Sequence, residues 1–402
     1  MSLAATSRIG GLALAATVLF AACGGSTATT APTTATRTAP SAAPSTEASM
    51  ASSTAPSTGT ASYRCTKGTG TINGAGSTFI NPLLTKMAGD YNTKCGVQIN
   101  YQSIGSGGGV KAWIANTVDF GASDAYLADS EITSAAANGV PIEVPVTFGA
   151  VVVAYNLTGL ANPLKMTPDI IAGIFLGKIA TWNDAAIATA NPGVTLPSTA
   201  ISVVHRSDGS GTTSIFTKYL TAVSTDWVTT VGGGDKTKSA GKTVTWPVGQ
   251  GASGNEGVTQ GIKGTDGGVG YIDVAYAIQN QIAFADVQNK SGNSITPTLA
   301  SVAAAANLPS YPADLRFNLV NTDAPQGYPI AGTTWMIVYQ DLSKVLKSQD
   351  QANALVDFIW WAIHDGQADA APLNYGSLPA NLLTQDEAAV KSISWAGAAL
   401  LP

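Results

Sequence analysis

Three short segments rich in glycine and hydroxyl residues have the composition of anion-binding loops. Each follows a predicted strand, and the segments are residues 74–79, 105–109 and 208–212. The first turn of a helix has unpaired N–H groups and a partial positive charge, glycine lets an anion approach the backbone, and Ser or Thr adds a hydroxyl donor. One such loop is also typical of an ordinary turn or helix cap. The recurrence of three loops, two of them opening predicted helices, favours an anion site.

Arg206 lies at the head of the third loop, two residues before Asp208. A guanidinium can bind a phosphoryl group through two parallel hydrogen bonds, and a neighbouring carboxylate can hold it in position. The alternative is an ordinary surface ion pair between the two residues. Alternation along the strand predicts that His205 points away from the site.

Asp124 ends a predicted strand, where a ligand would lie. A carboxylate repels an anion unless that anion carries a proton. Phosphate near neutral pH does carry one and can donate it to the carboxylate, whereas fully ionised sulfate would leave an unpaired charge facing the site. The alternative is that Asp124 caps a helix over residues 126–134. The spacing leaves both interpretations open.

The pattern of apolar residues predicts strands that alternate with helices. Predicted strands cover residues 70–76, 97–101, 118–123, 151–155 and 201–204, and predicted helices cover 82–91, 110–116 and 213–220. This alternation indicates an α/β architecture with largely parallel sheets. Ligands of such folds lie beyond the carboxyl ends of the strands, where the helices begin.

The composition limits the classes of function. The chain has 402 residues, a net charge of −5, and 45% hydrophobic against 11% charged residues. This length fits two lobes plus appendages, and the absence of basic runs argues against nucleic-acid binding. With two His residues and no CxxC motif in the sequence, we expect neither a metal site nor a cofactor.

The N-terminus has the pattern of an export signal with a lipid anchor. Arg8 precedes a short apolar run that ends in small residues before Cys23, which looks like a bacterial lipoprotein cleavage box. We predict a signal peptide over 1–22 and a lipid-anchored, disordered Ala/Ser/Thr/Pro-rich linker over 23–62. The alternative is ordinary secretion with an incidental Cys23. Outside the cytoplasm the remaining Cys65 and Cys95 are candidates for a disulfide, the alternative being two buried free thiols.

Several ordered blocks resemble the phosphate-binding protein of bacterial high-affinity phosphate ABC transporters, the PstS family. They are Gly-Ala-Gly-Ser-Thr-Phe at 74–79, Asn-Tyr-Gln-Ser-Ile-Gly-Ser at 100–106, Ala-Asn-Thr-Val-Asp-Phe-Gly-Ala-Ser-Asp at 115–124, Ile-Phe-Leu-Gly-Lys-Ile at 174–179, Arg-Ser-Asp-Gly-Ser-Gly-Thr at 206–212, Val-Gly-Tyr-Ile-Asp at 269–273 and Tyr-Gly-Ser-Leu-Pro at 375–379. The resemblance extends from about residue 70 to about residue 383.

This resemblance implies a two-lobed periplasmic-binding-protein fold, type II-like, with phosphate in the cleft between the lobes. The implied phosphate-binding residues are Thr78, Phe79, Ser106, Asp124, Arg206, Ser210, Gly211 and Thr212, with Asp208 supporting the arginine. We expect lobe I to comprise residues 63–154 plus 327–402, and lobe II residues 155–326. The implied protein is an extracytoplasmic monomer, held to the membrane by its lipid, that delivers phosphate to the permease subunits of the transporter.

Rival functions stay open at this point. A secreted phosphatase or serine hydrolase would need a nucleophile and a base, but Gly-x-Ser-x-Gly is absent at Ser106 and Ser210, and the chain offers only His205 and His364. We therefore expect no catalysis. A surface adhesin or sensor lipoprotein on the same fold is a second alternative. A paralogue that binds another oxyanion is a third alternative. Asp124 would not exclude arsenate, because arsenate also carries a proton near neutral pH.

Overall fold

The computed structural model describes residues 65, 70–160 and 163–402. The predicted signal peptide, the lipidation site Cys23 and the predicted linker lie outside the described residues. None of the helices in the described part of the chain has the length and hydropathy needed to cross a membrane.

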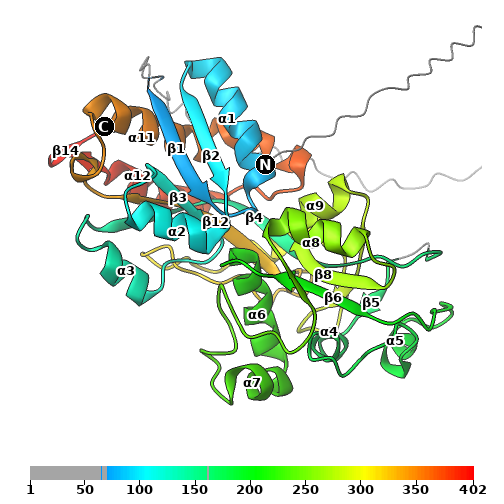
Figure 1. The fold of residues 1–402 in the computed structure, drawn as a ribbon. Coiled ribbons are helices and arrows are strands. Elements are labelled where there is room, and N and C mark those ends of the chain that lie inside the picture. The colour runs from blue at the N-terminus through cyan, green and yellow to red at the C-terminus, as the bar shows by residue number, and fades with distance from the viewer. Residues whose placement is uncertain (1–64, 66–69, 161–162) are drawn as a thin grey trace, which may run out of the picture. The chain divides into compact units, whose positions relative to one another are not determined.

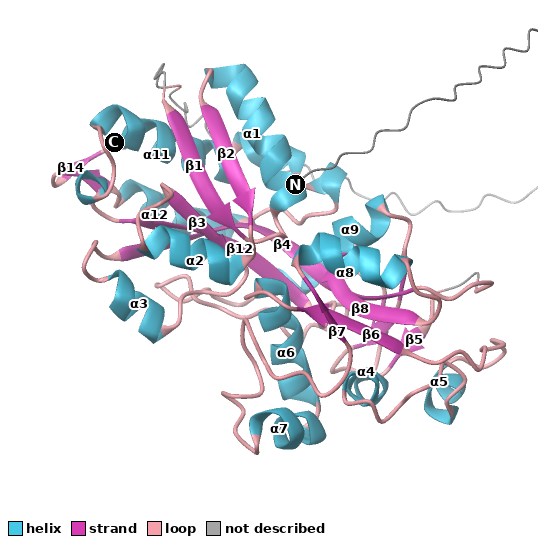
Figure 2. Ribbon diagram, viewed as in Figure 1, coloured by secondary structure: helices cyan, strands magenta, loops and turns pink. Residues whose placement is uncertain are grey.

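One nine-stranded sheet organises the molecule (Figures 1 and 2). Its path runs in the order β2-β1-β3-β12-β4-β8-β6-β7, with β9 paired to β4. The strands are β1 (Thr71–Gly76), β2 (Gln98–Ser103), β3 (Phe120–Ser123), β4 (Pro141–Tyr155), β6 (Ser202–Arg206), β7 (Gln250–Ala252), β8 (Gly268–Asp273), β9 (Ala283–Phe284) and β12 (Ala331–Tyr339). Short strands outside this sheet are β5 (Lys165–Met166), β10 (Asp286–Gln288), β11 (Ser294–Ile295), β13 (Ser394–Trp395) and β14 (Ala398–Ala399).

The long strand β4 joins the two ends of this sheet. It pairs antiparallel with β12 over Pro141–Ala150 and then antiparallel with β8 over Val151–Tyr155. Nearly all of its fifteen residues are buried, as expected for a strand covered on both faces. Pairing is parallel among β1, β2 and β3 and among β6, β7 and β8. The prediction of largely parallel sheets therefore holds at both ends of the sheet. It is wrong in the centre, where β12 pairs antiparallel with β3 and β4, and β4 pairs antiparallel with β8.

Helices pack on each end of the sheet. Helices α1, α2 and α11 contact the strands β1–β3, whereas α6, α8 and α9 contact β8 (Figure 1). The helices are α1 (Asn81–Cys95), α2 (Ser106–Ile114), α3 (Asp129–Ala135), α4 (Pro168–Phe175), α5 (Ala185–Ala190), α6 (Gly211–Val223), α7 (Thr225–Gly232), α8 (Gly254–Lys263), α9 (Val274–Gln279), α10 (Leu299–Ala306), α11 (Gln349–Ile363) and α12 (Ala380–Lys391). Short 3₁₀ helices cover Leu342–Lys344, Asp365–Asp369 and Ala371–Leu373.

Helices α2 and α6 begin two or more residues earlier than the sequence pattern predicts, and α3 begins later. Helix α2 begins at Ser106 rather than 110, and α6 begins at Gly211 rather than 213. Glycine and serine, which weaken the apolar pattern, therefore form the first helical turns themselves. Helix α3 begins at Asp129, with Ala128 at its N-cap. The alternative that Asp124 caps a helix over 126–134 is wrong, because Asp124 lies four positions before the actual N-cap, Ala128.

The remaining cysteines meet at the end of α1. Cys95 is the last residue of this helix, and in the structure it forms a disulfide with Cys65, thirty positions earlier. The alternative of two free thiols is wrong in this structure. The bond links Cys65 to the C-terminal end of α1.

Candidate functional site

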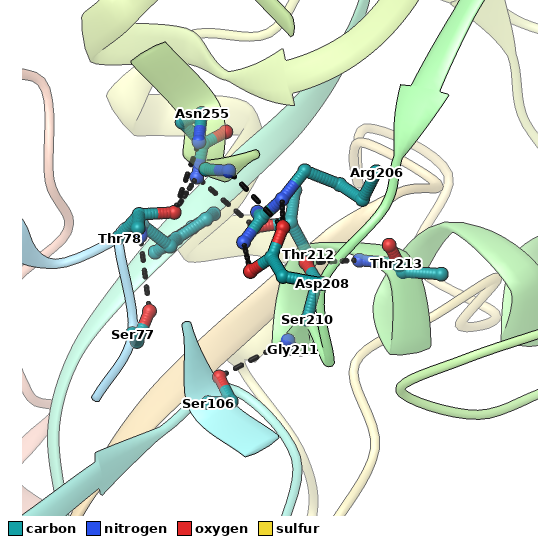
Figure 3. A network of polar contacts seen from close by, with 12 residues as sticks. Ser77, Thr78, Ser106, Arg206, Asp208, Ser210, Gly211, Thr212, Thr213 and Asn255 are labelled. Atoms are coloured by element: carbon teal, nitrogen blue, oxygen red, sulfur yellow. Dashed lines mark hydrogen bonds and ion pairs between the residues drawn. The ribbon is translucent and has the colours of Figure 1, made fainter. Parts of the chain in front are cut away.

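The loops that follow six strands lie at one region of the structure, because the parallel strands of both sheet ends point their carboxyl ends toward it. From one end come the residues after β1, β2 and β3, and from the other come those after β6, β7 and β8. Polar side chains from these loops contact one another directly (Figure 3). Every predicted anion-binding residue is buried, namely Thr78, Phe79, Ser106, Asp124, Arg206, Ser210, Gly211 and Thr212.

Arg206 is held at the end of β6 by Asp208. Its Nε donates to Asp208 Oδ1 at 2.7 Å, and Nη2 donates to the other carboxylate oxygen. The amide of Gly254 also donates to Asp208 Oδ1, at 3.0 Å. Burial alone would raise the pKa of Asp208, but the hydrogen bonds and charge of Arg206 hold it below its usual range. The Arg206 side chain is only 1% exposed, so the alternative of a surface pair is wrong.

One donor of Arg206 is unused. Its Nη1 is buried and has no hydrogen-bond partner within residues 65, 70–160 and 163–402. A buried cationic donor without an acceptor is costly unless something else occupies that position. A bound anion would supply the missing acceptor.

Asp124 lies directly after β3 and faces the same region. Thr334 on β12 donates to its Oδ1 at 2.7 Å. Burial raises the pKa of Asp124 to about 6, while hydrogen bonds from Ser77, Thr334 and Ser106 and the charge of Arg206 limit the rise. The carboxyl group is therefore mostly ionised at neutral pH and is available as a hydrogen-bond acceptor.

The second and third loops touch each other. The hydroxyl of Ser106 accepts hydrogen bonds from the amides of Asp124, at 3.2 Å, and Gly211, at 3.0 Å. The amide of Gly107 donates to the Gly209 carbonyl at 2.8 Å. A Cβ atom on Gly211 would lie 2.5 Å from Asp124 Oδ2. Glycine is thus required at the start of α6 for this close approach.

The hydroxyl groups of the site share one arrangement, in which each already accepts at least one hydrogen bond. The hydroxyl of Ser210 caps α6 by accepting from the Thr213 amide at 3.0 Å. The Thr78 hydroxyl accepts from the Asn255 amide at 3.1 Å and from Asn255 Nδ2 at 2.8 Å. Because a hydroxyl has one donor and two lone pairs, occupied lone pairs leave the hydrogen to be donated elsewhere.

The backbone at Thr78 and Phe79 is fixed by tyrosines. Tyr276 donates to the Thr78 carbonyl at 2.7 Å and Tyr375 to the Phe79 carbonyl at 2.6 Å. The Phe79 ring packs edge-on against Tyr375, with 6.0 Å between centroids. The amide of Phe79, a residue that the resemblance implies in phosphate binding, donates to the Ser77 hydroxyl at 3.0 Å. Like the Gly211 amide, it therefore already has an internal hydrogen-bond partner.

His205 points away from these residues, as alternation along β6 predicts. Its ring stacks on Trp246 with 5.1 Å between centroids. His364, the other histidine, contacts Glu387 at 2.9 Å at the end of α11. Neither histidine is placed beside Ser106 or Ser210 as a catalytic base.

The sequence interpretation missed two residues of the site, Asn255 and Thr334. Asn255 follows β7 in the segment Gln250-Gly251-Ala252-Ser253-Gly254-Asn255, which is a fourth strand, glycine-rich turn and helix start. The criterion that selected the other three loops would have found it. Thr334 lies inside the continuous buried strand β12, and no local signal distinguishes it from its neighbours.

Comparison with known proteins identifies the family. A model of the PBP superfamily domain matches residues 29–363. The phosphate-binding protein PstS of Xylella fastidiosa strain 9a5c is 43% identical over 320 residues, which cover 79% of this chain and 84% of that protein. The chain belongs to the PstS family. PstS of Pasteurella multocida strain Pm70 is 38% identical over 335 residues, covering 83% of this chain and 93% of the relative.

A solved structure confirms the fold. The phosphate-binding protein from Stenotrophomonas maltophilia superposes with a TM-score of 0.63 at 20% identity, covering 79% of this chain and 93% of that one. The predicted resemblance to the PstS family and the two-lobed α/β binding-protein fold are both confirmed. The relatives are named as binding proteins rather than as enzymes.

Proposed function

We propose that this protein is the extracytoplasmic solute-binding subunit of a phosphate ABC importer, which captures inorganic phosphate and delivers it to the membrane permease. The observation that carries the proposal is the pairing of two buried groups of opposite charge in one site. Arg206 offers an unused Nη1 donor, and Asp124 offers a carboxylate acceptor. The names of the PstS relatives support phosphate as the ligand.

The site matches the protonation state of phosphate. Its hydroxyl groups and Arg206 present donors, and Asp124 presents an ionised acceptor. Monohydrogen phosphate has acceptor oxygens for the donors and one hydrogen for Asp124. Sulfate has no hydrogen to give and would leave the Asp124 charge unpaired. Each charge-assisted bond contributes ~1.5–3 kcal/mol, but the net affinity is lower because closure and dehydration oppose binding.

In the proposed arrangement, lobe I comprises residues 63–154 plus 327–402, and lobe II comprises residues 155–326. The change of partners along β4, between Ala150 and Val151, supports a division close to the first boundary. Contacts between the two groups of residues include Gly107 with Gly209 and an ion pair between Glu131 and Lys242 at 2.6 Å. Phosphate would stabilise the closed arrangement because only that arrangement brings both sets of donors to it.

The finer parts of the proposal rest on the sequence. We place a lipid on Cys23. The protein would then be a monomer held at the outer face of the cytoplasmic membrane or in the periplasm, near its permease. We assign no catalytic role to the protein. The adhesin or sensor alternative is disfavoured because it predicts loss of ligand residues, and each one implied by the resemblance is present.

Calorimetry tests the proposal. The chain carrying Cys23→Ser would be purified, freed of phosphate by partial unfolding and dialysis, refolded, and titrated with phosphate at pH 7.5. We expect one site per chain with a Kd of about 1 µM or tighter. If protein with native circular dichroism and a cooperative melting transition binds no phosphate, the proposed function is wrong.

A further inference from the structure

We propose that Asn255 is a positioning residue, whose side-chain amide directs the hydroxyl hydrogens of Thr78 and Thr212 toward the anion. The inference rests on the proposed function, because the anion receives these hydrogens. It adds a role for a residue that the anion need not touch. Asn255 is fully buried at the start of α8, between the loops that carry the two threonines (Figure 3).

The orientation of the Asn255 amide is fixed by the backbone. The amide N–H of Asp273 donates to Asn255 Oδ1 at 2.9 Å. Because a backbone N–H can only donate, the oxygen of Asn255 must face Asp273, and the NH₂ group must face the other way. That group lies 2.8 Å from Thr78 Oγ1 and 3.2 Å from Thr212 Oγ1.

This orientation decides where the hydroxyl hydrogens go. The NH₂ group of Asn255 has two hydrogens, one for each threonine, and no lone pair that could accept a hydrogen bond. The backbone amide of Asn255 adds a second donor to Thr78 Oγ1 at 3.1 Å. Both lone pairs of Thr78 are then occupied, and neither threonine can donate toward Asn255. Their hydrogens are left for an acceptor on the other side.

Such an arrangement favours anion binding without a charge. A freely rotating hydroxyl can turn a lone pair toward an anion, and reorienting it on binding costs free energy. Donors that already point toward the ligand avoid this cost. Asn255 would thus set the direction of two donors at once.

A purely structural role for Asn255 must be separated from this one. Asn255 also satisfies the Asp273 amide, and its bond to Thr78 joins residues assigned to different lobes. Its bond to Thr212 does not cross the lobes, because α6 and α8 both contact β8. A coupling free energy between substitutions of Asn255 and Thr212 therefore measures the effect of Asn255 on the Thr212 hydroxyl, and not an effect on closure of the lobes.

The test is a double-mutant cycle on the full chain, with phosphate affinity measured by calorimetry. Asn255→Ala is made alone and together with Thr212→Val. We expect Asn255→Ala alone to weaken phosphate binding about 10- to 100-fold, the range of one or two lost oriented donors. In the Thr212→Val background, the fold-loss of phosphate affinity caused by Asn255→Ala should be at least about threefold smaller, since one of the two hydroxyls is gone. Equal losses in both backgrounds would overturn the proposal.

Thr213→Val is the matched control for the cycle. Thr213 is the next residue of α6, and its hydroxyl contacts Tyr271 at 2.7 Å instead of Asn255. Its effect should add to that of Asn255→Ala without coupling. If Thr213 couples to Asn255 as strongly as Thr212 does, the effect is a general loosening of α6 and the proposal is wrong.

Asn255→Asp gives a second route if the alanine variant does not fold. It keeps the shape and the oxygen that the Asp273 amide needs, but it replaces the donor group by an acceptor. The new carboxylate also repels the anion, so the loss of phosphate affinity is compared between the native and the Thr212→Val backgrounds. We expect the loss to be at least about threefold smaller in the Thr212→Val background, and equal losses would overturn the inference.

A ligand-independent measurement separates this inference from the proposed function. Neutron diffraction from crystals of the phosphate-free protein would locate the hydroxyl hydrogens of Thr78 and Thr212. We expect both to point away from the Asn255 amide, and a hydrogen on the Asn255 side would overturn the inference. Failure of the unmodified protein to bind phosphate would instead count against the proposed function.

Discussion

Asp124 and Asp386 are both buried carboxylates, but their polar surroundings differ. Asp124 receives hydrogen bonds from Ser77, Thr334 and Ser106 and faces Arg206, and burial raises its pKa only to about 6. Asp386, on α12, has no hydrogen-bond partner for either oxygen in the part of the chain that the structure describes. Burial, assisted by the charge of Glu387, raises its pKa to about 9.

The difference shows how the fold chooses the charge of a buried acid. Burial penalises the ionised form at both positions, and only hydrogen-bond donors and a positive charge offset that penalty. Asp124 is therefore an ionised acceptor at neutral pH, whereas Asp386 is protonated. A buried carboxylate indicates a binding site when donors surround it, and burial alone does not distinguish the two cases.

The largest expected effect comes from removing the positive charge beside Asp124. Arg206→Gln deletes the guanidinium, so the pKa of Asp124 should rise from about 6 toward that of Asp386. Phosphate affinity should fall by at least about 100-fold, because a buried charged partner of the anion is lost. Calorimetry at pH 7.5 measures the loss.

Arg316→Gln is the control for this change. Arg316 forms ion pairs with Asp314 and Asp129 away from the site, and its loss should change phosphate affinity less than about twofold, as expected for exposed pairs. Equal losses in the two variants would mean that Arg206 acts through the overall field of the protein and not at the site.

Asp386 should destabilise the protein at neutral pH. Its pKa is raised in the folded state, so folding keeps a proton on a group that is ionised in the unfolded chain, and stability falls as pH rises from about 4 toward 9. Replacing it by leucine removes this cost. We expect Asp386→Leu to increase the free energy of unfolding at pH 8 by on the order of 2 kcal/mol, and much less at pH 4.

Urea denaturation of both proteins at the two pH values checks this expectation. A gain that is the same at pH 4 and pH 8 would show that packing, rather than ionisation, explains it. The substitution should leave phosphate affinity unchanged, since Asp386 lies on α12 outside the loops of the site.

Selectivity should depend on pH through Asp124. Its pKa of about 6 means that the carboxylate, present at pH 7.5, is mostly protonated at pH 5. A protonated Asp124 no longer repels sulfate and can donate to it. We expect sulfate affinity to rise by about tenfold for each pH unit as the pH falls from 8 toward 6, and to level off below 6, as for a single titrating group. Sulfate titrations from pH 5 to 8 test this, and a flat profile would contradict the assignment.

The smallest expected effect comes from Thr334, which donates to Asp124 Oδ1 at 2.7 Å. Thr334→Val keeps the shape and removes one donor, so the pKa of Asp124 should rise and phosphate affinity at pH 7.5 should fall about three- to tenfold. Thr333→Val is the control, because Thr333 is equally buried but donates to the Thr147 carbonyl. A larger loss for Thr333→Val would assign the effect to packing of β12.

Much of the site could be predicted from the sequence because its residues follow strands. Glycine-rich turns after β1, β2 and β6, an arginine at a strand end and an acid after β3 are local patterns, and the fold brings the carboxyl ends of these strands together. The alternation of strands and helices predicted the α/β class for the same reason. The early starts of α2 and α6 were missed because glycine hides helical periodicity.

Other features depend on contacts between distant parts of the chain. Thr334 meets Asp124 across 210 positions, and Asn255 meets Thr78 across 177. The antiparallel direction of β4 and β12 follows from the return of the chain after the second group of strands. No local pattern shows that Asp386 lacks partners, because the polar residues Gln385 and Glu387 flank it in sequence, as on a solvent-exposed part of a helix.

The most direct test of the account is a comparison of the unmodified protein with Asp124→Asn, each titrated with phosphate and with sulfate at pH 7.5. Asparagine keeps the size of the side chain, removes its charge and supplies a donor. The account predicts that the unmodified protein binds phosphate and not sulfate, and that Asp124→Asn gains sulfate binding while its phosphate affinity falls at least about tenfold. Sulfate rejection that survives the substitution would contradict the claim that the ionised Asp124 selects the protonated anion.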